Sequence, residues 1–311
     1  MSGTAALPVV DFGRFDQSRQ QQREIAAAVD AALSQVGFMA VRNLGISDET
    51  LRAVFEASRA FFSNPLVDKQ RCGYQSARDN FGYQGIAQEN LDPTAPADLK
   101  ETFTMRNLLH RDPNATDWPS EDFRRLMTTF YETCLSASFK IMQALALALN
   151  TQEDFFKRCH SGENVTLRLL HYPSFEGRRV ATRQLGAGAH SDYGLLTLLF
   201  QDGVGGLEVQ RDRGDWAAVA ATRGEIVINS GDLLEVWTNG RYRSTVHRVQ
   251  PILGTDSRQS IAVFVDPDSA TQVTVLPSCT SADNPPRFSP TSAGEHLQRR
   301  IEASHKARFK A

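Results

Sequence analysis

The stretch AHSDYGLLTLLFQD, residues 189–202, places a histidine and an aspartate two positions apart, directly before a run of leucines. In an extended chain the side chains alternate across the strand, so His190 and Asp192 face one side and Ser191 faces the other. An imidazole nitrogen and a carboxylate oxygen in this arrangement can bind one metal ion. A core histidine that only hydrogen-bonds an aspartate explains the same residues, so a metal site needs a further ligand.

His247 is the candidate for that ligand. It lies in STVHRVQ, residues 244–250, which has the composition of a strand and follows a turn at Thr238-Asn239-Gly240. Two histidines and one carboxylate on one face of an ion leave neighbouring coordination positions open, which is the arrangement typical of non-haem Fe(II) oxygenases.

A second polar pair, Arg258 and Ser260, follows on the next predicted strand and shares one strand face. An arginine that points into a β-barrel costs free energy unless an anion meets it. A guanidinium together with a hydroxyl is well shaped to bind a carboxylate. The pattern therefore predicts a metal site beside a carboxylate site, as a dicarboxylic keto acid such as 2-oxoglutarate requires.

The chain after residue 163 has the texture of an antiparallel β-sandwich or barrel, because short runs rich in Val, Ile, Leu and Thr recur between Gly, Asp and Asn turns. The Asn-Gly pair at 239–240 is the clearest hairpin signal, since it supplies the positive φ angles of a tight turn. The predicted strands are VTLRLLHY, LLTLLF, GLEVQ, WAAVA, EIVIN, LLEVW, STVHRVQ, QSIAVFV and QVTVL.

The first half of the chain is predicted to be mainly helical. Helical spacing of apolar residues covers 19–36 and 120–150, Ser47 caps a helix to about Phe62, and GFMAVRNLGI at 37–46 is a predicted strand. Residues 70–107 are turn-rich and predict a long ordered loop or lid. TSAGEHLQRRIEASHKARFK predicts a closing helix. We expect a single domain over 1–311, divided into 1–162, a catalytic core at 163–277, and 278–311.

Composition points to a small-molecule partner rather than to nucleic acid or a membrane. Lys and Arg number 34 against 36 Asp and Glu, and no basic stripe stands out. No stretch approaches the length of a membrane span, and the N-terminus lacks the pattern of a signal peptide. The four cysteines have no CxxC spacing, so we expect reduced thiols in a cytoplasmic protein. The sequence does not predict the oligomeric state.

Together these motifs resemble the isopenicillin N synthase-like family of Fe(II)/2-oxoglutarate-dependent oxygenases. The resemblance spans nearly the whole chain and is carried by LPVVDF, GFMAVRNLGI, ADLKETF, HSDYGLLTLL, NSGD, TNG, VHRV and RQS. It implies a mainly β fold of the α+β type, with a double-stranded β-helix, or jelly roll, flanked by N-terminal, central and C-terminal helices. The block from His190 to Val209 is similar to microbial members, which suggests secondary metabolism.

The resemblance also implies roles for individual residues. His190, Asp192 and His247 match the iron ligands, and Arg258, Ser260 and Tyr172 match residues that bind 2-oxoglutarate. Leu170 stands where the family commonly has an asparagine, which leaves that amide contact to the cosubstrate in doubt. We further expect substrate contacts from Arg168, Phe81, Tyr83, Tyr193 and Phe264, with a rim position for the Arg168 head group as the alternative.

The expected reaction consumes O2 and 2-oxoglutarate, releases succinate and CO2, and hydroxylates, desaturates or rearranges a substrate that the sequence does not identify. No catalytic residue beyond the metal ligands is required, because the cofactor performs the difficult step. Three alternatives stay open: an iron oxidase of the same fold that does not use 2-oxoglutarate, a non-catalytic jelly-roll binding protein, and a zinc hydrolase, in which Arg258 and Ser260 lack a role.

Overall fold

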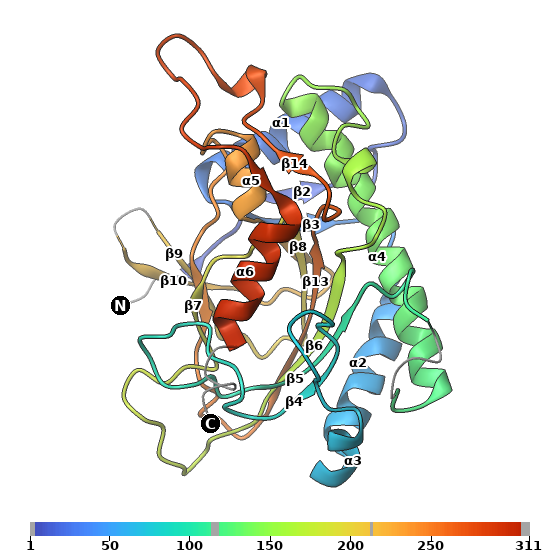
Figure 1. Ribbon diagram of the computed structural model, residues 1–311, viewed down its shortest axis with the longest axis vertical. Coiled ribbons are helices and arrows are strands. Elements are labelled where there is room, and N and C mark those ends of the chain that lie inside the picture. Colours follow the sequence, from blue (N-terminus) through green and yellow to red (C-terminus); the bar gives the residue numbers. More distant parts are fainter. Residues whose placement is uncertain (1–3, 113–117, 212–213, 306–311) are drawn as a thin grey trace.

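Two β-sheets form the centre of the molecule, and helices cover it (Figure 1). The structure is a computed structural model that describes residues 4–112, 118–211 and 214–305. The larger sheet has the strand order β2 (Val9–Asp11), β3 (Phe38–Arg42), β11 (Ile226–Ser230), β8 (Leu196–Gln201), β13 (Arg258–Val265), β6 (Thr166–Tyr172), β5 (Glu101–Arg106) and β4 (Gly82–Gln84). The smaller sheet has the order β1 (Thr4–Ala5), β10 (Trp216–Val219), β9 (Leu207–Gln210), β12 (His247–Val249) and β7 (Ala187–His190).

The larger sheet separates two hydrophobic cores. One lies between the larger sheet and the helices α1 (Arg19–Gln35), α2 (Asp48–Phe62) and α4 (Glu121–Ala148). The other contains residues from both sheets, among them Leu170 and Ala262 from the larger and Val209 and Val249 from the smaller. Because the second core joins the sheets face to face, the molecule is the expected jelly roll with flanking helices.

The predicted helices of the N-terminal half are confirmed, with their starts fixed by serine caps. The hydroxyls of Ser18, Ser47 and Ser120 each accept a hydrogen bond from a backbone N–H in the first turn of α1, α2 and α4. The closing helix is α6 (Ala293–His305), which lies across the front of the sheets in Figure 1. Residues 306–310 of the predicted helix lie outside the described residues. The remaining helical elements are α3 (Leu66–Arg71), the 3-10 turns Lys157–Cys159 and Pro277–Cys279, and α5.

The structure corrects the prediction of a strand at LLEVW and of a hairpin after it. Residues Asp232–Trp237 form helix α5, which buries Leu233, Leu234 and Trp237 at helical spacing. Asn239 and Gly240 do have positive φ angles of 54° and 79°. They end this helix, however, because the Gly240 N–H donates to the Glu235 carbonyl at 2.9 Å. A short apolar run does not distinguish a strand from a short helix by periodicity.

The expected loop at 70–107 is only partly a loop. Its last residues form β5, which pairs with β6 along its whole length, and β4 extends the same sheet. Polar and apolar residues alternate in ETFTMR, and Phe103 and Met105 lie in the core between the larger sheet and the helices, the helix-side core. This alternation is the strand signal that the turn-rich residues before it obscured. The strand predicted at 272–276 is also shorter than expected, since β14 covers Gln272–Val273, which pair with β15 (Thr291–Ser292).

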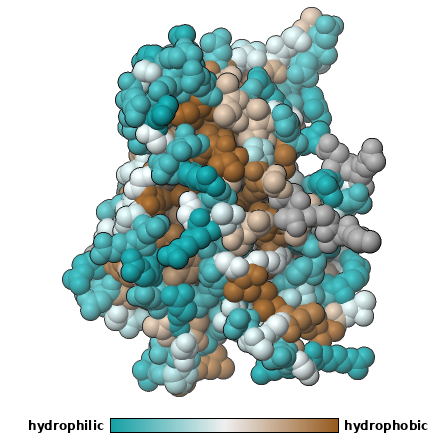
Figure 2. Space-filling view, turned by 180° about the vertical axis from the view of Figure 1, so that it is seen from behind, coloured by the Kyte–Doolittle hydropathy of each residue, from teal (hydrophilic) through white to brown (hydrophobic). Residues whose placement is uncertain are grey.

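The opposite face of the molecule is hydrophilic at its margins, with hydrophobic side chains gathered in patches along its middle (Figure 2). Within the described ranges, no helix is long and apolar enough to cross a membrane. Large exposed hydrophobic residues come from segments scattered along the chain: Val9, Leu66, Val67, Ile86, Leu109, Val204 and Leu253.

Candidate metal and cosubstrate site

The two histidines of the predicted metal site face each other across one strand pair. His190 is the last residue of β7, His247 is the first of β12, and the two are direct partners in the antiparallel register. Their rings lie 4.3 Å apart. Asp192 follows β7, and its Oδ1 lies 3.8 Å from His190 Nε2 and 3.7 Å from His247 Nε2. One ligand atom from each residue lies within 4.8 Å of the others, so the three converge on one point.

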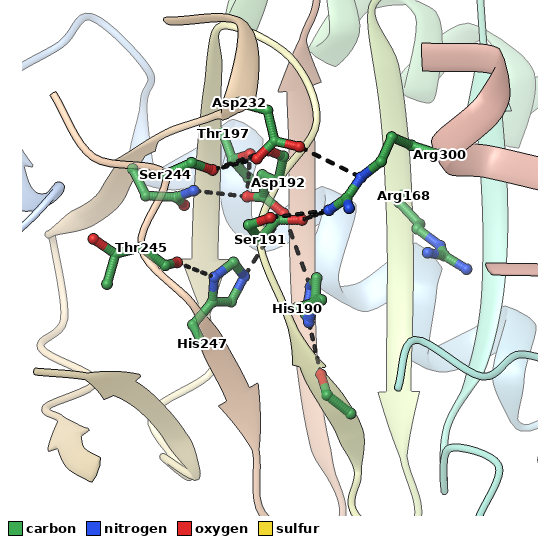
Figure 3. Close-up of polar contacts among 12 residues, drawn as sticks. Arg168, His190, Ser191, Asp192, Thr197, Asp232, Ser244, Thr245, His247 and Arg300 are labelled. Atoms are coloured by element: carbon green, nitrogen blue, oxygen red, sulfur yellow. Dashed lines mark hydrogen bonds and ion pairs between the residues drawn. The ribbon is translucent and has the colours of Figure 1, made fainter. Parts of the chain in front are cut away.

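Hydrogen bonds to the backbone indicate which ring nitrogens carry protons. His190 Nδ1 lies 2.7 Å from the Gly188 carbonyl, and His247 Nδ1 lies 3.1 Å from the Thr245 carbonyl (Figure 3). A carbonyl only accepts, so we assign the proton of each neutral ring to Nδ1. Each Nε2 then directs a lone pair toward a carboxylate oxygen. Three electron-pair donors facing one point suit a cation.

The two carboxylate oxygens of Asp192 have different roles: Oδ1 faces the candidate metal position, and Oδ2 accepts hydrogen bonds that hold the carboxylate in place. Its Oδ2 accepts hydrogen bonds from Thr197 Oγ1 at 2.5 Å and from Asn229 Nδ2 at 2.7 Å. Burial alone raises the pKa of this carboxyl, but His247, His190 and these two hydrogen bonds outweigh burial and lower it. Burial, with His247 beside it, lowers the pKa of His190. The site therefore presents an ionised carboxylate and a neutral His190 imidazole, which are the forms that bind a metal.

A network that the sequence analysis missed holds the backbone of this segment. Asp232 donates its N–H to the Asp192 carbonyl at 2.8 Å and accepts from Ser244 Oγ at 2.6 Å. Arg300 reaches from α6 to the Ser191 hydroxyl at 2.9 Å and carbonyl at 3.1 Å, and its Nε lies 3.4 Å from Asp232 (Figure 3). The NSGD motif gave a signal for Asp232, whereas nothing in the sequence pointed to Arg300.

The residues of the predicted carboxylate site also lie together. Arg258 is fully buried, donates to Ser260 Oγ and Gln201 Oε1 at 3.2 Å each, and stacks over the Tyr172 ring at 4.7 Å. No carboxylate pairs with Arg258 in the described part of the chain, and its Nε lacks a hydrogen-bond partner there. A buried guanidinium without an anion is costly, so this site fits one carboxylate of a bound molecule.

One cavity joins the two sites and continues beyond them. It is lined by the three candidate metal ligands, by Arg258, Ser260 and Tyr172, and by the expected substrate contacts Arg168, Tyr193 and Phe264. Leu170 also lines it, so an apolar side chain occupies the position where an amide was expected to be common. α6 contributes Ile301 and Ser304.

The structure corrects the expectation that Phe81 and Tyr83 contact the substrate. Neither side chain lines this cavity, and both belong to the helix-side core. Phe81 packs edge-on against Phe103, with ring centroids 5.7 Å apart, and the Tyr83 hydroxyl donates to Glu101 at 2.6 Å. Their aromatic character reflects packing of the segment onto the body of the protein.

The same segment supplies cavity residues that the sequence analysis did not single out. Glu89 and Lys100 line the cavity, and Asp98 adjoins them by pairing with Lys100 and accepting from the Gly188 N–H at 2.9 Å. The ADLKETF motif contains two of these residues. The sequence signal was therefore present, but Glu89 and Asp98 also contact Arg168 and Gly188, which lie far away along the chain.

Comparison with protein families and curated proteins is consistent with this geometry. The model of the 2OG-Fe(II) oxygenase superfamily matches residues 163–267, and that of the non-haem dioxygenase N-terminal region, described for morphine synthesis, matches residues 7–124. A proline hydroxylase from Petromyces alliaceus is 32% identical over 298 residues, which cover 91% of this chain and 93% of that protein.

Solved structures show the same likeness. A full-length Neurospora crassa protein, crystallised in complex with alpha-KG and thymine, is 29% identical with a TM-score of 0.86, over 96% of both chains. JOX2 in complex with 2OG, Fe and JA is 27% identical with a TM-score of 0.80, over 98% of this chain and 90% of that one.

Proposed function

Because this chain belongs to the 2OG-Fe(II) oxygenase superfamily, we propose that His190, Asp192 and His247 hold the Fe(II) ion with which it oxidises a small molecule at the expense of 2-oxoglutarate. The protein is thus a 2-oxoglutarate-Fe(II) dioxygenase. The observation that carries the assignment of residues is the convergence of two imidazole Nε2 atoms and one carboxylate oxygen on one point. Imidazole and carboxylate ligands with open positions suit Fe(II).

We assign the distal carboxylate of 2-oxoglutarate to Arg258 and Ser260, with Tyr172 beside them. Arg258 is buried without an acidic partner among the described residues, and a fork of two N–H donors matches a carboxylate. Gln201 and Ser260 hold the guanidinium from two sides, so its direction is fixed before the cosubstrate arrives.

Each residue of the site then has a separate task. Gly188 and Thr245 orient the histidine rings, and Thr197 and Asn229 orient the carboxylate of Asp192. When bound, Fe(II) with 2-oxoglutarate and O2 supplies the oxidising chemistry, which releases succinate and CO2. The protein itself binds and orients the reactants and excludes bulk water with its two sheets and α6.

The substrate occupies the remaining part of the cavity in this proposal, against Arg168, Tyr193 and Phe264. Hydroxylation is the reaction that the named relatives favour, since one of them is a proline hydroxylase. An oxidase that does not use 2-oxoglutarate is not favoured, because similar proteins were crystallised with alpha-KG or 2OG. We further propose that residues 1–311 act as one oxygenase domain in the cytoplasm, where four cysteines that form no disulfide fit a reducing environment.

The first prediction tests the metal ligands. His190→Ala and Asp192→Ala should each reduce anaerobic Fe(II) binding and succinate formation from 2-oxoglutarate at least about 100-fold, more than removal of a supporting residue does. His110→Ala, which changes an exposed histidine, is the matched control and should retain wild-type values. Wild-type Fe(II) binding and succinate formation in His190→Ala would rule out the proposed site.

A further inference from the structure

A buried cluster of charges forms the wall of the cavity on the side of β5 and β6. Lys100 Nζ lies 3.0 Å from Glu89 Oε2 and also pairs with Asp98, while Arg168 donates to the same Glu89 oxygen at 2.8 Å. The side chains of Lys100 and Asp98 are 1% exposed, that of Glu89 is 5% and that of Arg168 is 12%. Charges this deeply buried must balance one another locally.

Within the cluster the charges cancel, because two cations face two carboxylates. Burial lowers the pKa of Lys100, but Asp98 and Glu89 outweigh burial and raise it, so Lys100 stays protonated. Asp266 also lines the cavity, and burial raises its pKa to about 8, so it is uncharged at neutral pH. Arg106 is near enough to offset the charge of Asp266 if that group ionises.

The charges on the metal side of the cavity also cancel once Fe(II) and 2-oxoglutarate are bound. This half of the count rests on the proposed function. Fe(II) brings two positive charges and Arg258 brings one, while 2-oxoglutarate brings two negative charges and Asp192 brings one. The loaded cavity therefore has no surplus charge on either side.

The substrate wall nevertheless has unused hydrogen-bonding capacity. Arg168 Nε and Thr104 Oγ1 are buried and lack a hydrogen-bond partner among the described residues, and both side chains line the cavity. Thr104 is 2% exposed. Tyr193 and Phe264 add aromatic surface to the same cavity. A ligand that satisfies these donors gains hydrogen bonds, whereas a net charge brought here has no counter-charge left to meet it.

We propose that the substrate of this oxygenase carries no net charge: a small hydrogen-bonding molecule with a flat or apolar part beside Tyr193 and Phe264. The cost of burying an uncompensated charge exceeds the gain from the hydrogen bonds offered. Arg168 accordingly acts as a hydrogen-bond donor that Glu89 has already neutralised, and not as a binding site for an anionic substrate. Glu89 is the residue that sets this selectivity.

The test compares neutral and anionic molecules of like shape. Benzamide and benzoate, and nicotinamide and nicotinate, are titrated calorimetrically into the anaerobic Fe(II)/2-oxoglutarate complex. Wild type should bind the neutral member of a pair at least about tenfold more tightly. Glu89→Gln leaves one surplus positive charge and should bring the ratio to one or reverse it. Glu24→Gln makes the same change on the exposed face of α1 and should keep the wild-type ratio.

The other outcomes decide against the proposal. Anions that bind wild type as tightly as their neutral partners, a ratio unchanged in Glu89→Gln, or no neutral probe bound at all would each overturn it. If Glu89→Gln fails to fold, Arg168→Gln supplies the opposite change and should widen the wild-type ratio. Formation of the Fe(II)/2-oxoglutarate complex is measured first, by its absorption. If the complex does not form, the proposed function is wrong. The charge count on the metal side then no longer holds, and this inference fails with it.

Discussion

At the scale of single residues, the site depends on polar groups whose partners are supplied by other molecules. Arg258 shows this most clearly, because it is fully buried, it has only Ser260 and Gln201 as side-chain acceptors, and no acidic residue of the described chain neutralises it. Stability of the free protein alone does not explain a buried guanidinium that has no anionic partner. The free protein therefore carries a cost that binding of a carboxylate removes.

Because Arg258 lacks an anionic partner in the free protein, its substitution should weaken ligand binding without lowering the stability of the ligand-free protein. Arg258→Met should weaken 2-oxoglutarate binding at least about 30-fold, because loss of one partner of a buried charge pair costs about 2 kcal/mol or more. Without 2-oxoglutarate the same variant should be as stable as wild type, or up to about 1 kcal/mol more stable, since it no longer buries an unpaired charge. Titration calorimetry and urea unfolding of the ligand-free protein measure the two effects. Strong destabilisation of the ligand-free variant would show that Arg258 has a structural role.

At the scale of elements, α6 contacts two segments that lie far apart in the sequence and that both line the cavity. Arg300 binds the Ser191 hydroxyl and carbonyl and lies 4.5 Å over the Tyr193 ring, while the Ser304 carbonyl accepts from the Asn90 N–H at 3.3 Å. The helix thus contacts the metal-binding segment and the segment that supplies Glu89. Its contacts hold Ser191, which lies between two candidate ligands.

Arg300→Met is predicted to loosen the metal-binding segment without unfolding the protein. The Arg300 side chain is 38% exposed, so we expect a loss of only about 1 kcal/mol and a fall in Tm of about 2 °C. Amide hydrogen exchange in residues 187–195 should accelerate, because the Ser191 carbonyl and hydroxyl lose their donor. Arg299→Met on the exposed side of the same helix is the control. Equal exchange in both variants would show that α6 does not position this segment.

The secondary-structure elements also show which parts of the fold could be predicted from the sequence and which could not. The strands that carry His247 and Arg258 were predicted because each apolar run was long enough, or was flanked by turns clear enough, to define it. β7, which ends at His190, was not among the predicted strands, since its sequence AGAH contains no apolar run that defines a strand. Residues 232–237 were predicted as a strand because LLEVW is too short to show a helical period, and only the contacts of Leu233, Leu234 and Trp237 with the core establish the helix. Asn239 and Gly240 had the expected backbone angles but a different role.

At the scale of the whole molecule, the site likewise combines residues that local sequence patterns predict with contacts that depend on the fold. His190, Asp192, His247, Arg258 and Ser260 could be selected from the sequence because each stands in a short motif and the order of the motifs is specific. The contacts of Glu89 with Arg168 and of Arg300 with Ser191 could not be predicted, because they join segments that meet only after folding. Local patterns predicted the parts of the site, and the charge balance of the cavity required the fold.

We predict that acid stability depends on His160, a buried histidine that does not line the cavity. His160 is 2% exposed, its Nδ1 lies 2.6 Å from the Phe156 carbonyl, and its Nε2 has no hydrogen-bond partner among the described residues. Burial lowers the pKa of His160 to about 4 in the folded protein, below the ordinary value of 6.5. The unfolded chain therefore takes up a proton between these two values while the folded chain does not.

A lowered folded-state pKa means that the stability contribution is complete above pH 6.5 and is lost as the pH falls toward 4. Between pH 7.5 and pH 5, His160 should account for about 2 kcal/mol of the loss in the free energy of unfolding. In His160→Phe this part of the loss should disappear, whatever the stability of the variant at pH 7.5, whereas His110→Phe at an exposed position should keep it. Urea unfolding of the three proteins at both pH values measures the difference. An identical loss in His160→Phe and wild type would show that His160 does not limit acid stability and that the other buried groups, with the metal ligands among them, account for it.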